Sequence, residues 1–120
     1  MKFINIDFKG KVNNDEPHFA RGTGLVDYLS VSYKKLVSVF GEPNAENDGY
    51  KTDAEWVIFT PAGIATIYNY KTGKNYLKDA GTPIDEITDW HIGGRNKGVV
   101  KWLKLALGLE WALRVLLCFS

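Results

Sequence analysis

Apolar side chains recur at helical spacing in one segment of the first half of the chain. Within residues 31–40 they occupy positions i, i+3, i+4 and i+7, which share one helical face: Tyr33, Leu36, Val37 and Phe40. Ser30 or Ser32 can cap the free N–H groups at its start, and Gly41 suits the left-handed residue that follows a last turn. The pattern predicts a helix over residues 31–40.

Runs of aromatic and β-branched residues predict strands elsewhere. Residues 3–8 alternate over a short run that Gly10 and a polar stretch then end. Residues 55–59 and 64–70 flank the sequence Thr-Pro-Ala-Gly at 60–63, a turn with proline early and glycine late, so they predict a β-hairpin. A further short strand is expected from Asp89 to Ile92.

The C-terminal segment is apolar at nearly every position from Val99 to Phe119. Its central charges make a membrane span unfavourable, because each costs roughly 2.5–3.5 kcal/mol on insertion scales. The segment is better interpreted as a long buried helix with a narrow solvent stripe at Lys97, Lys101, Lys104 and Gly108. Its wide apolar arc predicts self-association; the alternatives are a fully internal helix or an amphipathic helix lying on a membrane.

Together these elements predict an α+β fold. A small antiparallel sheet, made of the N-terminal strand, the central hairpin and the short 89–92 strand, is packed by the helix at 31–40 and the long C-terminal helix. Residues 82–85 predict a capped helical turn with Pro83 at its first position, whereas residues 21–24 are interpreted as a loop. The chain has 120 residues, the usual size of one domain, and we expect a single domain over residues 1–120.

Composition narrows the function classes. The formal net charge is +1, so any basic site must be local rather than a property of the whole molecule. A lone cysteine, Cys118, cannot form an internal disulfide, and one cysteine with two histidines cannot supply a four-ligand zinc site. We therefore expect no metal and no cofactor. The N-terminus lacks the pattern of a secretion signal, so a cytoplasmic location is expected.

The first candidate site lies between residues 89 and 98. Glycines after a strand can turn backbone N–H groups toward a phosphate, a helix start adds partial positive charge, and neighbouring cations and aromatic rings can grip the rest of a ligand. The alternative is a tight strand-to-helix turn with a tryptophan in the core. The residues assigned to this site are Trp90, His91, Gly93, Gly94, Arg95 and Lys97.

The second candidate site is the turn at residues 68–76. Tyrosines alternate with lysines there, and aromatic stacking combined with positive charge suits a nucleotide or a protein partner. The alternative is an ordinary strand end with solvated lysines. The residues assigned to this site are Tyr68, Tyr70, Lys71, Lys74 and Tyr76.

Catalytic signatures are sparse. Asp89 and His91 are two positions apart, so on a strand their side chains share a face and can pair as orienting carboxylate and general base. The sequence marks no nucleophile beside them. We assign no catalytic residue and keep a small hydrolase or nuclease as an alternative hypothesis.

Several motifs resemble those of small, uncharacterised bacteriophage proteins over roughly residues 22–98. They are LVSVFGEP at 36–43, AEWV at 54–57, ATIYNYK at 65–71 and DWHIGG at 89–94. The helix and hairpin are also similar to the corresponding unit of β-lactamase-inhibitor-like domains, which bears on fold alone.

The resemblance implies a phage accessory protein that acts by binding in the cytoplasm of an infected host. It would counteract a host defence, either by sequestering a phosphorylated small molecule such as a nucleotide signal or by blocking a host defence protein. A purely structural phage component is kept as an alternative hypothesis. The expected homo-oligomer, formed through the C-terminal helix, rests on the apolar arc of that helix and not on the resemblance.

Overall fold

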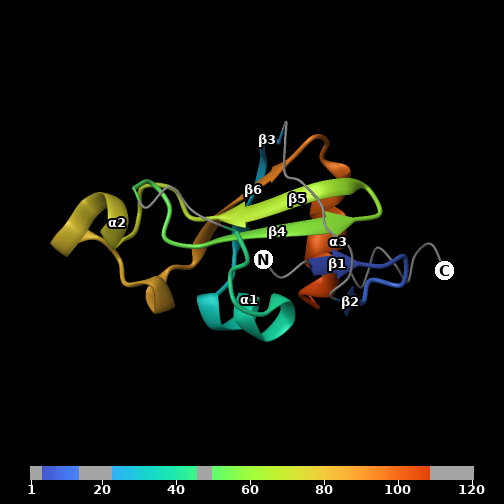
Figure 1. Cartoon of the computed structure of the whole chain (residues 1–120), viewed down its shortest axis with the longest axis horizontal. Coiled ribbons are helices and arrows are strands. Elements are labelled where there is room, and N and C mark those ends of the chain that lie inside the picture. Colours follow the sequence, from blue (N-terminus) through green and yellow to red (C-terminus); the bar gives the residue numbers. More distant parts are fainter. Residues whose placement is uncertain (1–3, 14–22, 46–49, 109–120) are drawn as a thin grey trace.

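The computed structural model describes residues 4–13, 23–45 and 50–108 (Figure 1). Within these residues six strands form one sheet in the order β2-β1-β4-β5-β6-β3. Strands β1 and β4 are parallel, and all other neighbours are antiparallel. The strands are β1 (Ile4–Ile6), β2 (Val12–Asn13), β3 (Gly24–Ser30), β4 (Glu55–Thr60), β5 (Gly63–Tyr68) and β6 (Asp89–Gly94). The expected α+β class is confirmed, and the sheet, which was expected to be antiparallel, is mostly so, with β1 parallel to β4.

The helices are short. They are α1 (Tyr33–Phe40), α2 (Lys74–Leu77) and α3 (Gly98–Ala106), with 3-10 turns η1 (Lys78–Ala80) and η2 (Ile84–Glu86). Helix α1 and the turn η2 follow the sequence patterns closely. Helix α2 stands at one end of the molecule, away from α1 and α3 (Figure 1). No helix formed by the described residues is long and apolar enough to span a membrane.

The ends of α1 are fixed by the residues that the sequence indicated. The Ser32 hydroxyl accepts a hydrogen bond from the Lys35 N–H at 3.0 Å, which caps the N-terminus. Gly41 has a φ of 84°, a left-handed conformation that glycine adopts without strain, and its N–H donates to the carbonyl of Val37. The helix therefore presents a defined face, on which Leu36 and Phe40 are buried.

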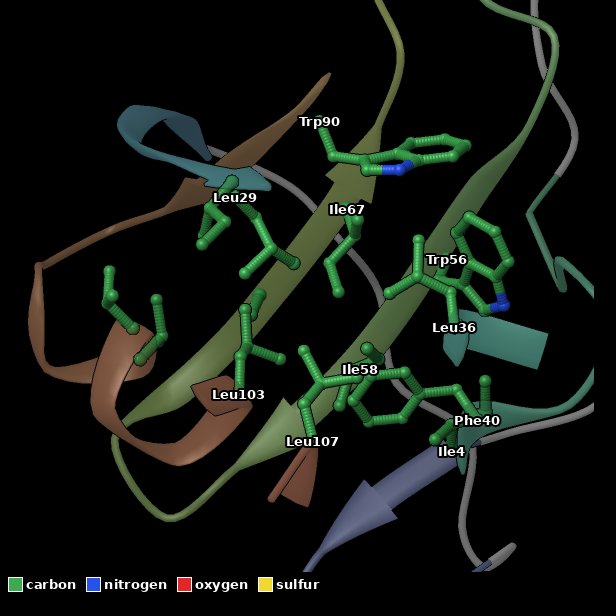
Figure 2. Packing of buried hydrophobic residues seen from close by; sticks show 14 of the residues in the cluster. Ile4, Leu29, Leu36, Phe40, Trp56, Ile58, Ile67, Trp90, Leu103 and Leu107 are labelled. Atoms are coloured by element: carbon green, nitrogen blue, oxygen red, sulfur yellow. The ribbon is translucent and has the colours of Figure 1, made fainter. Parts of the chain in front are cut away.

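One face of the sheet carries the hydrophobic core. Alternate residues of β4 are buried there, because side chains of a strand point to opposite faces in turn. Helices α1 and α3 both pack on this face, and Figure 2 shows Leu36 and Phe40 from α1, Leu103 from α3 and Leu107 just after α3 directed toward it. The opposite face of the sheet is not covered by α1 or α3.

Two buried tryptophans tie α1 to the sheet. The indole N–H of Trp56 on β4 donates to the carbonyl of Gly41 at 2.8 Å, just after α1. The indole N–H of Trp90 on β6 donates to the carbonyl of Val31 at 3.0 Å, just before α1. The two rings are 5.5 Å apart in an edge-to-face arrangement. Both ends of α1 are thus anchored by side chains of the sheet.

The long C-terminal helix is not confirmed. Helix α3 ends at Ala106, and Gly108 adopts a φ of 69°, a backbone conformation that commonly terminates a helix. Residues 109–120, on which the self-association hypothesis mainly depends, lie outside the described residues. In the described part, Lys97, Lys101 and Gly108 are exposed and Lys104 is partly exposed, as the predicted stripe requires.

Strand β2 was not expected from the sequence, and strands β3 and β6 differ from the sequence-based expectation. Residues 24–30 form β3, which pairs with β6 and carries a bulge between Leu25 and Asp27. Strand β6 extends through Gly93 and Gly94, which pair with β5 and β3 instead of forming a turn. A β-carbon at Gly94 would lie 2.8 Å from a methyl group of Val99, so glycine here lets α3 pack closely on the strand.

Candidate functional site

The face of the sheet that points away from α1 and α3 carries a row of aromatic side chains. In the strand register, Tyr68 of β5 lies opposite His91 of β6, and His91 lies opposite Tyr28 of β3. Because opposite residues on neighbouring strands point to the same side, all three side chains stand on the face away from α1 and α3. Tyr70 follows two positions after Tyr68 and continues the row just beyond the end of β5.

These residues form one contact group, which we call the tyrosine cluster: Tyr28, Tyr68, Tyr70 and His91. The ring centroid of His91 lies 5.1 Å from that of Tyr28, 5.4 Å from that of Tyr68 and 5.7 Å from that of Tyr70. The Tyr28 side chain is 61% exposed and that of Tyr70 is 39% exposed. The cluster therefore combines a half-buried imidazole with tyrosine rings that have free surface for a ligand.

Partial burial sets the protonation states in this cluster. Burial lowers the pKa of His91 below its ordinary value of 6.5, so the imidazole is mainly neutral at pH 7. Burial, followed by the negative charge of Glu55, raises the pKa of Tyr68, which keeps its hydroxyl protonated. At neutral pH the His91 ring and the Tyr68 hydroxyl are thus uncharged.

The His91 titration gives a direct test of this environment. We expect an NMR titration of the imidazole to show a midpoint below 6.5, because the folded state disfavours the cation. Stability contributed by the neutral ring is then fully present above about pH 6.5 and is lost as the pH falls toward the folded-state pKa. A His91→Gln variant should show a weaker loss of stability between pH 7.5 and 5. A midpoint at or above 6.5 would contradict this description.

A hollow lies beside the cluster. It has a volume of about 400 Å³, is open to solvent, and is lined by Tyr28, Leu29, Ser30, Asp89, Trp90 and His91. Ligand pockets begin at roughly 300 Å³, so this hollow can hold one planar ring system. A second hollow of about 180 Å³ shares Asp89 with the first and is otherwise lined by Thr72, Thr82, Glu86, Ile87 and Thr88.

A lysine extends the aromatic row away from the sheet. The Nζ atom of Lys71 lies 5.3 Å from the ring centroid of Tyr70 and 5.3 Å from that of Tyr76. The Tyr76 ring in turn contacts that of Tyr50, with centroids 5.1 Å apart. The ammonium group is therefore held next to the tyrosine cluster by cation–π contacts. Lys74, three positions further along the chain, is the first residue of α2.

A network of polar side chains holds the backbone of residues 69–75 in place. The fully buried side chain of Asn69 accepts hydrogen bonds from the N–H groups of Asp53, at 2.7 Å, and Ala54, at 3.1 Å. Its amide donates to Asp53 Oδ1 at 2.9 Å, and Asp53 Oδ2 accepts from the N–H of Asn75. Residues 69–75 are thus fixed to the segment before β4.

This framework supports an uncommon conformation at Lys71. Its φ is 59°, in the left-handed region that side-chain-bearing residues seldom adopt, and its N–H donates to the carbonyl of Lys51 at 2.7 Å. A β-carbon at Gly73 would collide with the carboxylate of Asp53, so glycine is required at that position. Backbone strain of this kind persists only where neighbouring contacts hold it, and here it directs Lys71 to the tyrosines.

The structure brings part of the two predicted sites together. His91, from the first, contacts Tyr68 and Tyr70, from the second. Arg95 and Lys97 lie elsewhere: the neighbouring Asn96 amide donates to the carbonyl of Ala62 in the β4–β5 turn. That turn is at the opposite end of β5 from Tyr68, and the five residue steps from Gly63 to Tyr68 span roughly 17 Å at 3.4 Å per residue.

The other residues predicted for the first site, Trp90, Gly93 and Gly94, contribute to the packing of the sheet. Trp90 is 0% exposed, and its ring belongs to the core face, although its backbone borders the hollow. The backbones of Gly93 and Gly94 pair with neighbouring strands. A β-carbon at Gly93 would collide with the hydroxyl of Thr66, so the glycine allows close packing on the face away from α1 and α3.

Sequence reasoning missed Tyr28. It belongs to β3, whose apolar and polar residues do not alternate cleanly because a bulge interrupts the strand after Leu25. The run Leu25-Val26 followed by Tyr28-Leu29 was the available signal, since β-branched and aromatic residues between polar loops indicate a strand. Asp89, considered only as a partner of His91, also emerges as a lining residue of both hollows.

Comparisons of the chain with protein-family models, with curated proteins and with solved structures found no match. Among the described residues, no group of His, Cys, Asp and Glu side chains is arranged to hold a metal ion.

Proposed function

We propose that the chain is a binding protein that holds a nucleotide-like ligand on the tyrosine cluster. The observation that carries this proposal is the meeting of Tyr28, Tyr68 and Tyr70 around His91 at a ring-sized hollow, with the Lys71 ammonium beside Tyr70. Aromatic rings stack on nucleobases, and a lysine neutralises a phosphate. The ligand class is a planar ring joined to a phosphate.

The dimensions support such a ligand. The Tyr70 ring lies 5.7 Å from the His91 ring and 5.3 Å from the Lys71 ammonium. A base beside His91 would place its sugar over Tyr70 and its phosphate near Lys71. Arg95 and Lys97, at the far end of β5, take no part in this arrangement.

The biological role that we propose follows from the resemblance to small bacteriophage proteins. A phage accessory protein with this surface would sequester a phosphorylated signal of a host defence. The alternative binding role, blockage of a host defence protein, would use the same exposed aromatic surface, because tyrosines are enriched in protein interfaces.

The hydrolase hypothesis receives less support. Asp89 and His91 share a face of β6 and line the same hollow, as their spacing predicts. Burial alone accounts for the lowered pKa of His91, whereas a carboxylate that oriented the ring as a general base would raise it. We therefore assign His91 a role in binding.

Calorimetric titration with nucleoside 5′-monophosphates, cyclic oligonucleotides and the corresponding nucleosides tests the proposal. We expect at least one nucleotide to bind and its nucleoside to bind more weakly. Tyr28→Ala should weaken nucleotide binding by about 5- to 150-fold, which corresponds to the 1–3 kcal/mol that stacking of one base on an aromatic ring contributes. A Lys71→Met variant should bind nucleotide and nucleoside with similar affinity.

Phe8→Ala is the matched control. Phe8 is 82% exposed and contacts Trp102 of α3, so the variant removes an exposed ring outside the tyrosine cluster. Its nucleotide affinity should equal that of the parent. Absence of binding heat with every nucleotide would overturn the proposal and leave the protein-partner role.

A further inference from the structure

The two hollows share a carboxylate that the proposed function does not yet use. Asp89 is exposed at the start of β6 and lines both hollows. Within the described part of the chain, no residue donates a hydrogen bond to its side chain or forms an ion pair with it. An ionised carboxylate is an acceptor only, so a ligand that meets it in the larger hollow must bring N–H or O–H donors.

The position of Asp89 fixes which part of the ligand it meets. Asp89 and His91 lie on the same side of β6, and Ser30 lies directly opposite Asp89 on β3. All three line the larger hollow, whose wall is completed by the Tyr28 ring. A base stacked in this hollow would therefore turn one edge toward the carboxylate, whereas the Lys71 ammonium lies over the Tyr70 ring, which does not line the hollow.

We infer that the base bound in the larger hollow is guanine, read through its N1–H and 2-amino groups by the Asp89 carboxylate. This inference rests on the proposed function. Guanine alone among the common bases presents two parallel N–H donors on its Watson–Crick edge, which match the two oxygens of a carboxylate. The Ser30 hydroxyl, next to Asp89, is available to the O6 carbonyl.

The other bases fit this edge poorly. Adenine and cytosine each turn a ring nitrogen acceptor toward the carboxylate beside a single amino donor, so one carboxylate oxygen faces a lone pair. Uracil and thymine present one donor between two carbonyl acceptors. A paired donor–acceptor mismatch of this kind carries about 1–3 kcal/mol of discrimination, equivalent to about 5- to 150-fold in affinity. Exposure of Asp89 to water places the expected preference toward the lower part of that range.

The test compares four purine nucleotides that share sugar and phosphate and differ at the edge of the base. Calorimetric titrations use GMP, IMP, AMP and XMP with the parent chain and with Asp89→Asn. For the parent we expect GMP to bind on the order of tenfold or more tightly than AMP and XMP, with IMP intermediate because it lacks the 2-amino group.

Asp89→Asn should reverse the preference for GMP over XMP. Its amide offers one acceptor for N1–H and one donor for the 2-carbonyl of xanthine, so XMP should bind more tightly than GMP. Asp85→Asn, which removes an exposed carboxylate of η2 outside both hollows, should keep the order of the parent.

The outcomes separate this inference from the proposed function. Equal binding of GMP and AMP by the parent overturns guanine recognition while the nucleotide site stands. Retention of the GMP preference in Asp89→Asn overturns the role of Asp89. Absence of binding by all four nucleotides, with the cyclic oligonucleotides also inactive, overturns both the proposed function and this inference. The parent comparison decides the question even if the substitution impairs folding.

Discussion

Trp90→Ala is expected to lower the free energy of unfolding by about 3–5 kcal/mol, the usual cost of truncating a buried tryptophan. The side chain is 0% exposed, packs edge-to-face on Trp56 and lies 6.4 Å from the Tyr33 ring in a stacked arrangement. Its indole N–H also holds the carbonyl of Val31 at the start of α1. The substitution thus removes core packing and one anchor of the helix together.

Urea unfolding followed by far-ultraviolet circular dichroism measures this loss. Trp102→Ala is the matched control, because it removes the same side chain from a partly exposed position on α3. We expect it to cost about 1–2 kcal/mol, in proportion to its smaller buried area. A loss for Trp90→Ala no greater than for Trp102→Ala would show that Trp90 is not the core anchor described above.

Asn69→Ala is the second substitution with a large expected effect. It leaves the N–H groups of Asp53 and Ala54 without their acceptor, and each unpaired group costs about 1–3 kcal/mol when buried, so we expect a total loss of about 2–6 kcal/mol. The same change releases residues 69–75, and nucleotide affinity should fall because Tyr70 and Lys71 are no longer held in place.

Asn69→Asp separates the acceptor function from the donor function. The new carboxylate can still accept hydrogen bonds from the two N–H groups. It faces the carboxylate of Asp53, however, which in the parent chain accepts a hydrogen bond from the Asn69 amide. Repulsion between the two acids should destabilise the variant at pH 7 and should lessen as the pH is lowered toward 4. Unfolding curves at the two pH values measure the difference. Wild-type stability for Asn69→Ala would contradict the structural role of the network.

Local signals in the sequence were sufficient where an element is defined by its own residues. Ser32 and Gly41 mark the ends of α1, and the proline and glycine between residues 60 and 63 mark the hairpin. Helix periodicity and turn chemistry act over a few residues, so they can be read without knowledge of the rest of the chain. The class of fold followed from these elements.

Long-range pairing escaped the same reasoning. Strand β3 pairs with β6, from which it is separated by residues 31–88, and its bulge disturbs the alternation that would mark it clearly in the sequence. The parallel pairing of β1 with β4 likewise has no local signature. Sequence spacing placed His91 on a strand, but it could not show that Tyr28 lies opposite.

The site was predicted in part for the same reason. The aromatic residues of the 68–76 segment and His91 were recognised by type, and the structure places Tyr68 and Tyr70 against His91. Arg95 and Lys97 were grouped with His91 because they are close in sequence, yet the strand carries them to the opposite end of the sheet. Residues that are close in sequence are far apart in space on an extended strand, because each residue adds about 3.4 Å.

The pairing of β3 with β6 also has a consequence for folding. Bringing β3 and β6 together across residues 31–88 costs chain entropy before the paired strands contribute any stabilising contacts. Topologies rich in such long-range contacts fold slowly, on the order of milliseconds to seconds. Tyr28 reaches His91 only when this closure is complete. A nascent chain that lacks β6 therefore has no complete binding surface. A ligand present at about 100 times its Kd would favour the closed sheet by about 2.7 kcal/mol.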